Sequence, residues 1–127
     1  LYLVDTGSQL FIWVGGESVA ELLQDAFGIM SIDQLPIGKL EVPYLQSSEF
    51  NIRINNIISK IRENDESCSY KNIYFVKGHS MSEPVNNSSA ELSSMRTWLH
   101  SFLVEDKCGE VQTYRAYLST LNSKVGK

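Results

Sequence analysis

The first 28 residues constrain the fold more than any other stretch of this chain. Residues 2–5 and 9–14 are rich in aromatic and β-branched side chains, and a short polar turn around Gly7 separates them, which predicts a β-hairpin. Glycine suits this turn because it adopts positive φ without strain. The runs Leu1–Val4 and Leu10–Val14 are almost continuously apolar, so they predict strands covered on both faces of a mixed or α/β sheet.

A helix is predicted directly after this hairpin. Ser18 and Glu21 have the spacing of a capping box at a helix N-terminus, and Gly28 stands where a left-handed residue would end the helix. The predicted apolar face comprises Val19, Leu22, Leu23, Ala26 and Phe27. The preceding glycine pair lacks the rest of a phosphate-binding motif and is followed by Glu17, so nucleotide binding is not expected.

The middle of the chain predicts a linker, a helix and a strand. Residues 29–46 contain two prolines and no periodicity, which indicates an extended linker packed across the surface. A second helix is predicted from Ser47-Ser48-Glu49, with an apolar face made of Phe50, Ile54, Ile57, Ile58 and Ile61. Its cations, Arg53, Lys60 and Arg62, are expected on a solvated face, where Arg53 and Lys60 are candidates for partner contacts. Residues 72–77 predict a buried strand.

The last part of the chain predicts a polar loop over 78–89 and two further helices. His79 is expected to be a solvent-exposed loop residue, and Ser88 with Glu91 forms a second capping-box pattern. The third helix has its apolar residues at Leu92, Met95, Leu99, Phe102 and Leu103. After a break at Gly109, a seam spaced by three and four residues comprises Val111, Tyr114, Leu118, Leu121 and Val125. Such a seam predicts a fourth helix that packs on another helix.

Composition limits the class of protein. A chain of 127 residues and 14.3 kDa suits one compact domain. A net charge of −4 disfavours a nucleic-acid surface, and no apolar run approaches the roughly 20 residues of a membrane span. The chain starts within a strand-like pattern, so we expect it to be a fragment of a longer protein. Cys68 and Cys108 lack metal-ligand spacing and indicate reduced thiols, with a single disulfide left open.

One short motif points to catalysis. Asp5-Thr6-Gly7, after an apolar strand, is the pattern in which aspartic proteases hold a catalytic carboxylate. That chemistry needs a second aspartate facing the first, and this chain has one such turn in a largely helical sequence. The other interpretation is a hairpin turn in which Asp5 accepts hydrogen bonds from local backbone amides. His100 has no ligand-type residue at helical spacing that would build a zinc site.

The opening hairpin resembles the strand pair of gelsolin-like domains, through Tyr2-Leu3-Val4-Asp5-x-Gly7 and then Trp13-Val14-Gly15. Taken in order, the proline-containing linker, the isoleucine-rich helix, the strand at 72–77 and a final helix with Tyr114-x-x-Tyr117-Leu118 are similar to the C-terminal end of the cargo-adaptor subunits of the COPII vesicle inner coat. The resemblance implies an α/β (α+β) fold with a central mixed sheet flanked by helices. The gelsolin-like domain would span about 1–90 of residues 1–127, and C-terminal helices about 89–125.

This resemblance also implies a role. The chain would be a non-enzymatic structural or protein-interaction module in ER-to-Golgi vesicle transport and cargo sorting, with no catalytic, cofactor-binding or metal-binding residue of its own. Zinc and cargo would be bound upstream in the parent protein. The parent would bind the sister inner-coat subunit and other coat proteins, without nucleic acid. It would lie in the cytoplasm, on COPII vesicles and at endoplasmic reticulum exit sites, as a peripheral protein without a transmembrane segment.

Calcium-regulated actin-binding repeats of the gelsolin and villin type are the alternative within this fold. They commonly bind calcium through a carboxylate in the helix that follows the Trp-x-Gly turn. This chain has Leu22 and Leu23 at that point, although Glu17 and Glu21 are close in sequence. Because a calcium site needs several converging oxygens, the sequence favours the coat-type module.

Overall fold

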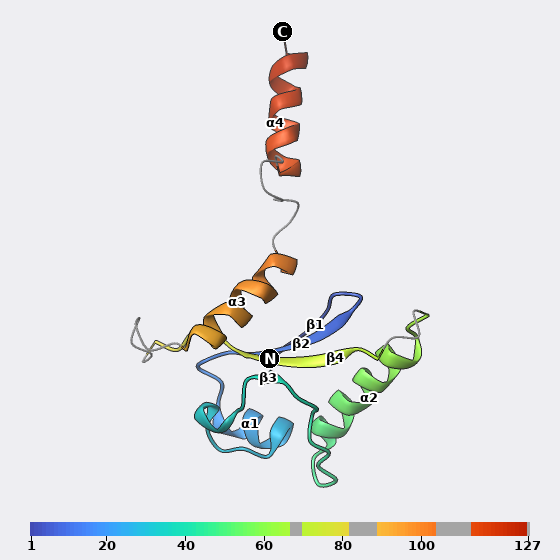
Figure 1. The fold of residues 1–127 in the computed structure, drawn as a ribbon, viewed down its shortest axis with the longest axis vertical. Helices are drawn as coiled ribbons and strands as arrows, with labels where there is room; N and C mark the ends of the chain where they lie inside the picture. The colour runs from blue at the N-terminus through green and yellow to red at the C-terminus, as the bar shows by residue number, and fades with distance from the viewer. Residues whose placement is uncertain (67–69, 82–88, 104–112, 127) are drawn as a thin grey trace. The chain divides into compact units, whose positions relative to one another are not determined.

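A mixed sheet with the strand order β1-β2-β4-β3 is the centre of the fold (Figure 1). The structure, a computed structural model, describes residues 1–66, 70–81, 89–103 and 113–126. β1 (Tyr2–Asp5) and β2 (Gln9–Val14) are antiparallel, β4 (Asn72–Lys77) is parallel to β2, and the short β3 (Gly38–Lys39) is antiparallel to β4. The predicted hairpin and the predicted strand at 72–77 are therefore confirmed.

The helices fall in two compact units, Leu1–Arg96 and Thr97–Lys127. The helices are α1 (Ala20–Phe27), the 3₁₀ helix η1 (Ile32–Gln34), α2 (Glu49–Glu63), α3 (Ala90–Leu103) and α4 (Tyr114–Val125). The first unit holds the sheet with α1, η1, α2 and the first half of α3. The second holds the rest of α3 and α4. Within the described residues, no helix is both long and apolar enough to cross a bilayer.

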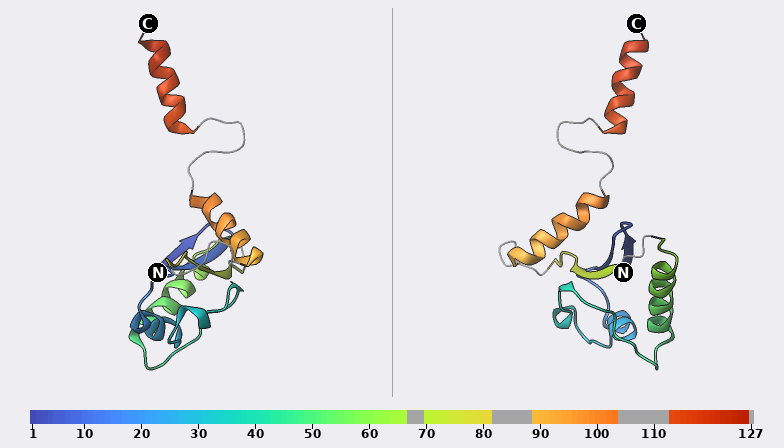
Figure 2. Two further views of the ribbon diagram at one scale, coloured as in Figure 1. Left: turned by 90° about the vertical axis from the view of Figure 1, so that its left-hand side faces the viewer. Right: turned by 45° about the vertical axis from the view of Figure 1, so that its right-hand side comes forward.

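The core of the first unit lies between one face of the sheet and the pair α1 and α2, which Figure 2 shows from two further sides. Strand side chains alternate between faces, so Leu10, Ile12 and Val14 of β2 point into this core. Their β4 neighbours Ile73 and Phe75 do the same. Phe11 and Val76, which alternate with them, are also completely buried. β2 and β4 are thus covered on both faces, as their apolar sequences predict.

The prediction that the first strand is also covered is wrong. β1 is the edge strand, with β2 as its neighbour in the sheet, and Tyr2 is 70% exposed. An edge position leaves one side of a strand without a neighbour. An apolar sequence therefore identified the strand correctly but not its place in the sheet.

The segment 29–46 has more structure than a linker. It contains η1 and β3, and the Leu40 amide donates a hydrogen bond to the Ile73 carbonyl at 3.0 Å. Leu35 and Val42 are buried in the core. The prediction that this segment packs on the body of the domain is confirmed. The prediction that it is an extended linker without regular structure is wrong, because it contains η1 and β3. Two residues of strand are too few to produce a period in the sequence.

The first predicted capping box is wrong, although the helix itself and its end are correct. α1 begins after Val19, and Ser18 Oγ instead donates to the Gly15 carbonyl at 2.7 Å. Val19 and Glu21 are exposed. Gly28 closes the helix in the left-handed conformation at φ 71°, as predicted. Ser18 is engaged by the glycine turn that precedes α1, which places the helix start later.

α2 begins as predicted, and Ile54, Ile58 and Ile61 of its predicted apolar face pack against the core. Ser48 is its N-cap and accepts a hydrogen bond from the Asn51 amide at 3.2 Å. Ile58 is buried, but Phe50 and Ile57 are 38% and 52% exposed. Asn51, a polar residue, is completely buried. The isoleucine pattern therefore found the helix and misassigned part of its buried face.

The two last helices are confirmed within the described residues, as α3 and α4. Ser89 Oγ accepts a hydrogen bond from the Leu92 amide at 3.2 Å, whereas Ser88 of the predicted capping box lies outside the described residues. Leu92 and Leu99 are buried, but Phe102 and Leu103 of the predicted apolar face are exposed. α4 has Thr113 as its N-cap and contains no buried residue. The predicted features at Cys68, Cys108, Gly109 and Val111 also lie outside the described residues.

Candidate functional site

The turn that carries Asp5 is held by backbone and by a lysine. Asp5 Oδ1 accepts a hydrogen bond from the Gly7 amide at 2.9 Å, and Gly7 has a φ of 92°. Lys71 Nζ, on a side chain that is 7% exposed, lies 3.1 Å from each carboxylate oxygen of Asp5. The hairpin-turn interpretation of Asp5 is confirmed. Lys71, from the residue before β4, is a partner that no local pattern indicated.

This arrangement does not provide the chemistry of an aspartic protease. A catalytic dyad brings two carboxylates together so that they share a proton. Here the ammonium group of Lys71 contacts Asp5 and also lies 3.9 Å from Asp65 Oδ2, at the end of α2. The carboxylates therefore face a cation rather than sharing a proton with each other, which is not the arrangement of a catalytic dyad. The cluster therefore links the hairpin turn to the entrance of β4, and its role is structural.

Replacing Asp5 by asparagine tests this structural role. We expect Asp5→Asn to lower the free energy of unfolding by about 1–2 kcal/mol, because it removes the negative charge that faces a buried ammonium group. Urea denaturation measures the change. Asp25→Asn, at an exposed position on α1, is the matched control and should stay within about 0.5 kcal/mol of the parent. Equal stability of both variants would contradict the structural role.

The carboxyl ends of β2 and β4 are the place where an open α/β sheet commonly binds a ligand. In this protein the two loops that follow these strands pack directly against each other. A Cβ atom on Gly16 would lie 2.5 Å from the His79 carbonyl oxygen, and one on Gly78 would lie 3.0 Å from the Trp13 ring. The Gly78 amide also donates to the Val14 carbonyl at 2.7 Å. Gly16 of the glycine pair, together with Gly78, is thus required for close packing between the two loops.

Glu17 links these two loops through hydrogen bonds. Its Oε1 accepts hydrogen bonds from Ser80 Oγ and from the Met81 amide, both at 2.7 Å. The hydrogen bond from Ser80, and then that from the Met81 backbone, lower the pKa of the Glu17 carboxyl below its ordinary value of 4.5. Glu17, whose negative charge disfavours a phosphate site in the sequence, therefore connects the two loops.

The Glu17 contact should depend on pH. A carboxyl whose pKa is lower in the folded protein stabilises the fold above its unfolded pKa, and this contribution disappears as the pH falls through the folded value. We expect the protection of the Met81 amide from hydrogen exchange to fall below pH 4.5. Glu17→Gln keeps an acceptor but has no charge to lose, so its Met81 protection factor should be independent of pH in this range. NMR-detected exchange measures both, and a shared pH profile would refute this role of Glu17.

Arg96 of α3 is buried and forms hydrogen bonds with the end of β4 and the loop that follows it. It is 4% exposed. Its Nε donates to the Lys77 carbonyl at 2.7 Å, its Nη2 donates to the Gly78 carbonyl at 2.9 Å, and its Nη1 lies 3.0 Å from His79 Nδ1. His79 is exposed, as predicted, but it has a partner. The strand ends are therefore bonded to a side chain of the protein itself, and Arg96 had no sequence signal beyond its place in a helix.

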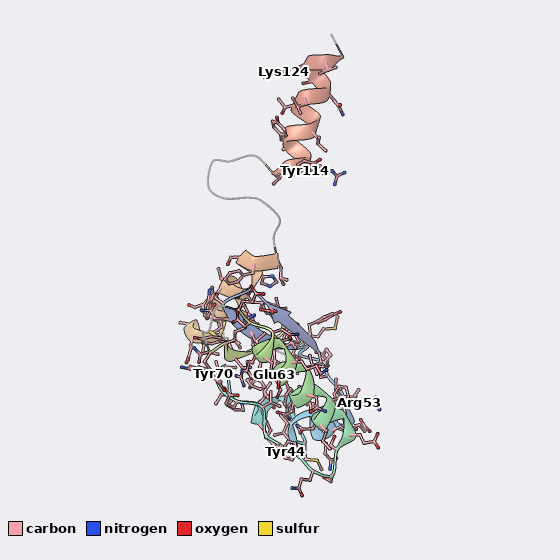
Figure 3. All side chains as sticks on the ribbon, turned by 90° about the vertical axis from the view of Figure 1, so that its right-hand side faces the viewer. Tyr44, Arg53, Glu63, Tyr70, Tyr114 and Lys124 are labelled. Carbon is pink, nitrogen blue, oxygen red and sulfur yellow. The ribbon has the colours of Figure 1, made fainter. Side chains whose placement is uncertain are left out.

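The cations of α2 divide into two groups. Arg53 is 75% exposed and forms a loose pair with Glu49 at 3.7 Å, so it lies on the solvated face that the sequence predicts, as does Lys60. The prediction is wrong for Arg62. Its guanidinium group donates to both carboxylate oxygens of Glu41 at 3.0–3.2 Å and to a backbone carbonyl. Figure 3 shows Arg53 towards the start of α2.

Tyr70 extends the Arg62 cluster at the other end of α2 (Figure 3). Its ring centroid lies 4.1 Å from the Arg62 guanidinium carbon, and its hydroxyl donates to Glu41 Oε1 at 3.0 Å. Desolvation and this hydrogen bond raise the pKa of the Tyr70 phenol. The cluster ties the 29–46 segment to the end of α2, which is a packing role.

An apolar groove of about 190 Å³ lies between β1 and α2. Its lining comprises Leu1, Tyr2, Leu3, Ile12, Phe27, Phe50, Ile54 and Ile57. It contains no titratable group apart from the phenol of Tyr2, so it offers apolar contact and no acid–base chemistry. The sequence placed Phe50 and Ile57 on the apolar face of α2, and only the structure shows that the core leaves them exposed.

The described residues contain no group of three or more His, Cys, Asp or Glu side chains that could hold a metal ion. His100 is exposed on α3. Glu17, near the point where calcium-binding repeats place a carboxylate, is engaged with Ser80 and Met81. Leu22 is half-buried and Leu23 is buried on α1. The sequence expectation of no catalytic, cofactor or metal residue stays a prediction.

Comparison with known proteins assigns the family. Residues 1–58 match the family model of the gelsolin repeat. The whole chain is 47% identical over 128 residues to the protein transport protein SEC24 of Kluyveromyces lactis, and 44% identical over 128 residues to SEC24 of Saccharomyces cerevisiae. The chain spans 14% of the length of each of these relatives.

A solved structure agrees with the fold. The crystal structure of the human COPII-coat protein Sec24c matches 97% of this chain with a TM-score of 0.72, at 22% sequence identity, and the match covers 14% of that chain. The four-stranded mixed sheet and its helices thus form the predicted gelsolin-like arrangement. Because the similarity to SEC24 proteins extends over 100% of the chain, the chain belongs to the SEC24 family, as a segment that contains a gelsolin repeat.

Proposed function

We propose that this segment is a non-enzymatic structural module of a COPII coat subunit that acts in ER-to-Golgi transport and cargo sorting. The observation that supports it best is the 47% identity to SEC24 of Kluyveromyces lactis over the whole chain. The polar contacts of the domain agree with a structural role. Asp5, Glu17 and Arg96 each form hydrogen bonds with other parts of the domain. These contacts stabilise the fold.

The proposal extends to partners and location through the longer protein. The parent would bind the sister inner-coat subunit and other coat proteins, and it would collect cargo through regions upstream of this segment. It would work on the cytosolic face of the membrane, at endoplasmic reticulum exit sites and on COPII vesicles, as a peripheral protein. Zinc would be bound upstream, and this segment would need no cofactor. The similarity to proteins named SEC24 and COPII-coat protein Sec24c supports the coat-subunit part of this proposal.

A segment exchange tests the proposed function. The matching segment of Saccharomyces cerevisiae SEC24 is replaced by this chain, and secretory transport is measured in cells that depend on the chimera. We expect transport near the parental rate, whereas deletion of the segment should abolish it. The same chimera with Asp5→Asn should also support transport, because the proposal assigns Asp5 no catalytic role. A chimera that accumulates to the parental level but does not transport cargo would refute the proposal.

Calcium-regulated actin binding is the competing function, because residues 1–58 match a gelsolin repeat. Pelleting of the chain with filamentous actin, with and without calcium, separates the two. The coat proposal expects the chain to remain in the supernatant under both conditions. Calcium-dependent pelleting would favour the actin-binding alternative.

A further inference from the structure

β1 is the outer strand of the sheet, with β2 on one side and no described strand on the other (Figure 1). Hydrogen-bonded and non-bonded residue pairs alternate along an antiparallel ladder. At the turn, the Thr6 amide donates to the Gln9 carbonyl at 3.0 Å. Counted back from that pair, Leu3 and Ile12 form a non-bonded pair. The N–H and C=O groups of Leu3 therefore point away from β2, where a further strand could bond to them.

The apolar groove between β1 and α2 lies beside this edge. Leu1 and Leu3 line it from β1, and Phe50, Ile54 and Ile57 line it from α2. Four of these side chains, those of Leu1, Leu3, Phe50 and Ile57, are between 36% and 52% exposed. A strand added to β1 would place alternate side chains on the groove side of the sheet. It would thus cover the exposed apolar side chains and satisfy the outward backbone groups together.

The α2 rim of this groove is positively charged. Residues three and four apart on a helix are neighbours, which places Arg53 beside Phe50 and Ile57. The same spacing places Lys60 beside Ile57. Arg53 is 75% exposed, and its pair with Glu49 is loose at 3.7 Å, so this pair holds Arg53 only weakly. Carboxylates on a segment that lies along β1 would therefore meet two cations at this rim.

We propose that β1 and this groove bind an extended segment of another protein as a fifth strand, and that this segment has large apolar residues at alternate positions with acidic residues beside them. Hydrogen bonds to the β1 backbone and apolar contact in the groove would provide affinity. Carboxylates that face Arg53 and Lys60 would select the partner by charge. This inference adds a partner site to the proposed structural function and does not depend on which coat proteins the parent binds.

Peptide binding to the full-length protein that contains this segment tests the inference. The probe is a fluorescent peptide of sequence ETLTLTE with both ends blocked, and anisotropy measures its Kd, which we expect at about 10–100 µM because the peptide must be ordered on binding. Ile57→Asp should weaken binding by at least about tenfold, since it places a charge in the groove. Arg53→Glu with Lys60→Glu should weaken it by about tenfold. Asn56→Glu with Ser59→Glu is the matched control, because these exposed positions lie on the far side of α2, and its Kd should stay within about twofold of the parent. An unchanged urea midpoint verifies that each variant is folded.

Changes in the peptide test how it binds. The peptide KTLTLTK should bind about tenfold more weakly, because lysines would face the cationic rim. N-methylation removes amide donors, and only one of the two alternating sets of amides can face β1. Of two peptides that are N-methylated at the leucines or at the threonines, one should therefore lose binding and the other keep it.

Four results would overturn the inference. They are no binding of ETLTLTE, binding that survives Ile57→Asp, equal binding of the two N-methylated peptides, and binding by the chain of 127 residues but not by the full-length protein. The fourth result would show that another part of the same polypeptide already covers this edge. A dimeric mass that Ile57→Asp abolishes, without peptide binding, would instead indicate a second copy of the chain and would also overturn the inference. If the segment exchange restores transport while the peptide does not bind, only this inference fails.

Discussion

Asn51→Leu is expected to lower the free energy of unfolding by about 3 kcal/mol or more, although leucine is apolar and close to asparagine in size. Asn51 is completely buried. Its Nδ2 donates to the carbonyls of Ala26 and Pro43 at 2.6 and 2.8 Å, and its Oδ1 accepts from the Leu45 amide at 2.8 Å. Leucine would leave the Ala26 carbonyl and the Leu45 amide without this partner in the domain interior, where each unsatisfied group costs about 1–3 kcal/mol. The Pro43 carbonyl would keep only the longer hydrogen bond from Asn55 Nδ2 at 3.3 Å.

Urea denaturation of Asn51→Leu measures this loss. Asn56→Leu is the matched control, because it makes the same substitution at an exposed position of the same helix, and it should change stability by less than about 0.5 kcal/mol. A midpoint shift without a change in slope would show that the folded state lost stability. If both variants unfold within about 1 kcal/mol of the parent, Asn51 does not connect α1, the linker and α2 as the structure indicates.

Gly16→Ala is the second large effect that we expect, at about 2–4 kcal/mol of lost stability. The new Cβ atom would lie 2.5–2.6 Å from the backbone of His79 and Ser80. Those atoms cannot move independently, because Glu17 and Arg96 hold the same loop. The loops after β2 and β4 would have to separate, and the contacts at the strand ends would weaken together.

Gly15→Ala supplies the control for this substitution. Its Cβ would meet Ser18 Oγ at 3.6 Å, an ordinary contact, and Gly15 does not have a positive φ. Its stability should therefore stay within about 1 kcal/mol of the parent, with a gain allowed because alanine restricts the unfolded chain. Thermal unfolding of the two neighbouring variants compares them directly. A Gly16→Ala protein as stable as Gly15→Ala would contradict the close packing of the two loops.

Local sequence signals found most of the elements of this fold. The turn at Gly7 and the left-handed end at Gly28 are set by a glycine that tolerates positive φ. The cap of α2 at Ser48 depends on an amide three residues away. Each of these features forms within one turn of chain, so the residues that determine it are adjacent in the sequence.

The signals failed where a distant segment competes for a side chain. Arg62 resembles a solvated cation but binds Glu41, 21 residues away. Lys71 reaches Asp5 across 66 residues. No period or motif in one sequence records such pairings, because they depend on which elements the fold brings together.

The sequence by itself determined the hairpin, the buried strand at 72–77, the order of the helices and, through its similarity over the whole chain, the SEC24 family. Tertiary structure alone decided that Asn51 is a buried polar centre, that Gly16 is a point of contact between loops, and that Asp5 faces a lysine. The physical reason is the distance along the chain over which each effect acts. Backbone preference and hydrophobic period act over a few residues, whereas burial and hydrogen-bond pairing depend on segments that meet only in the folded chain.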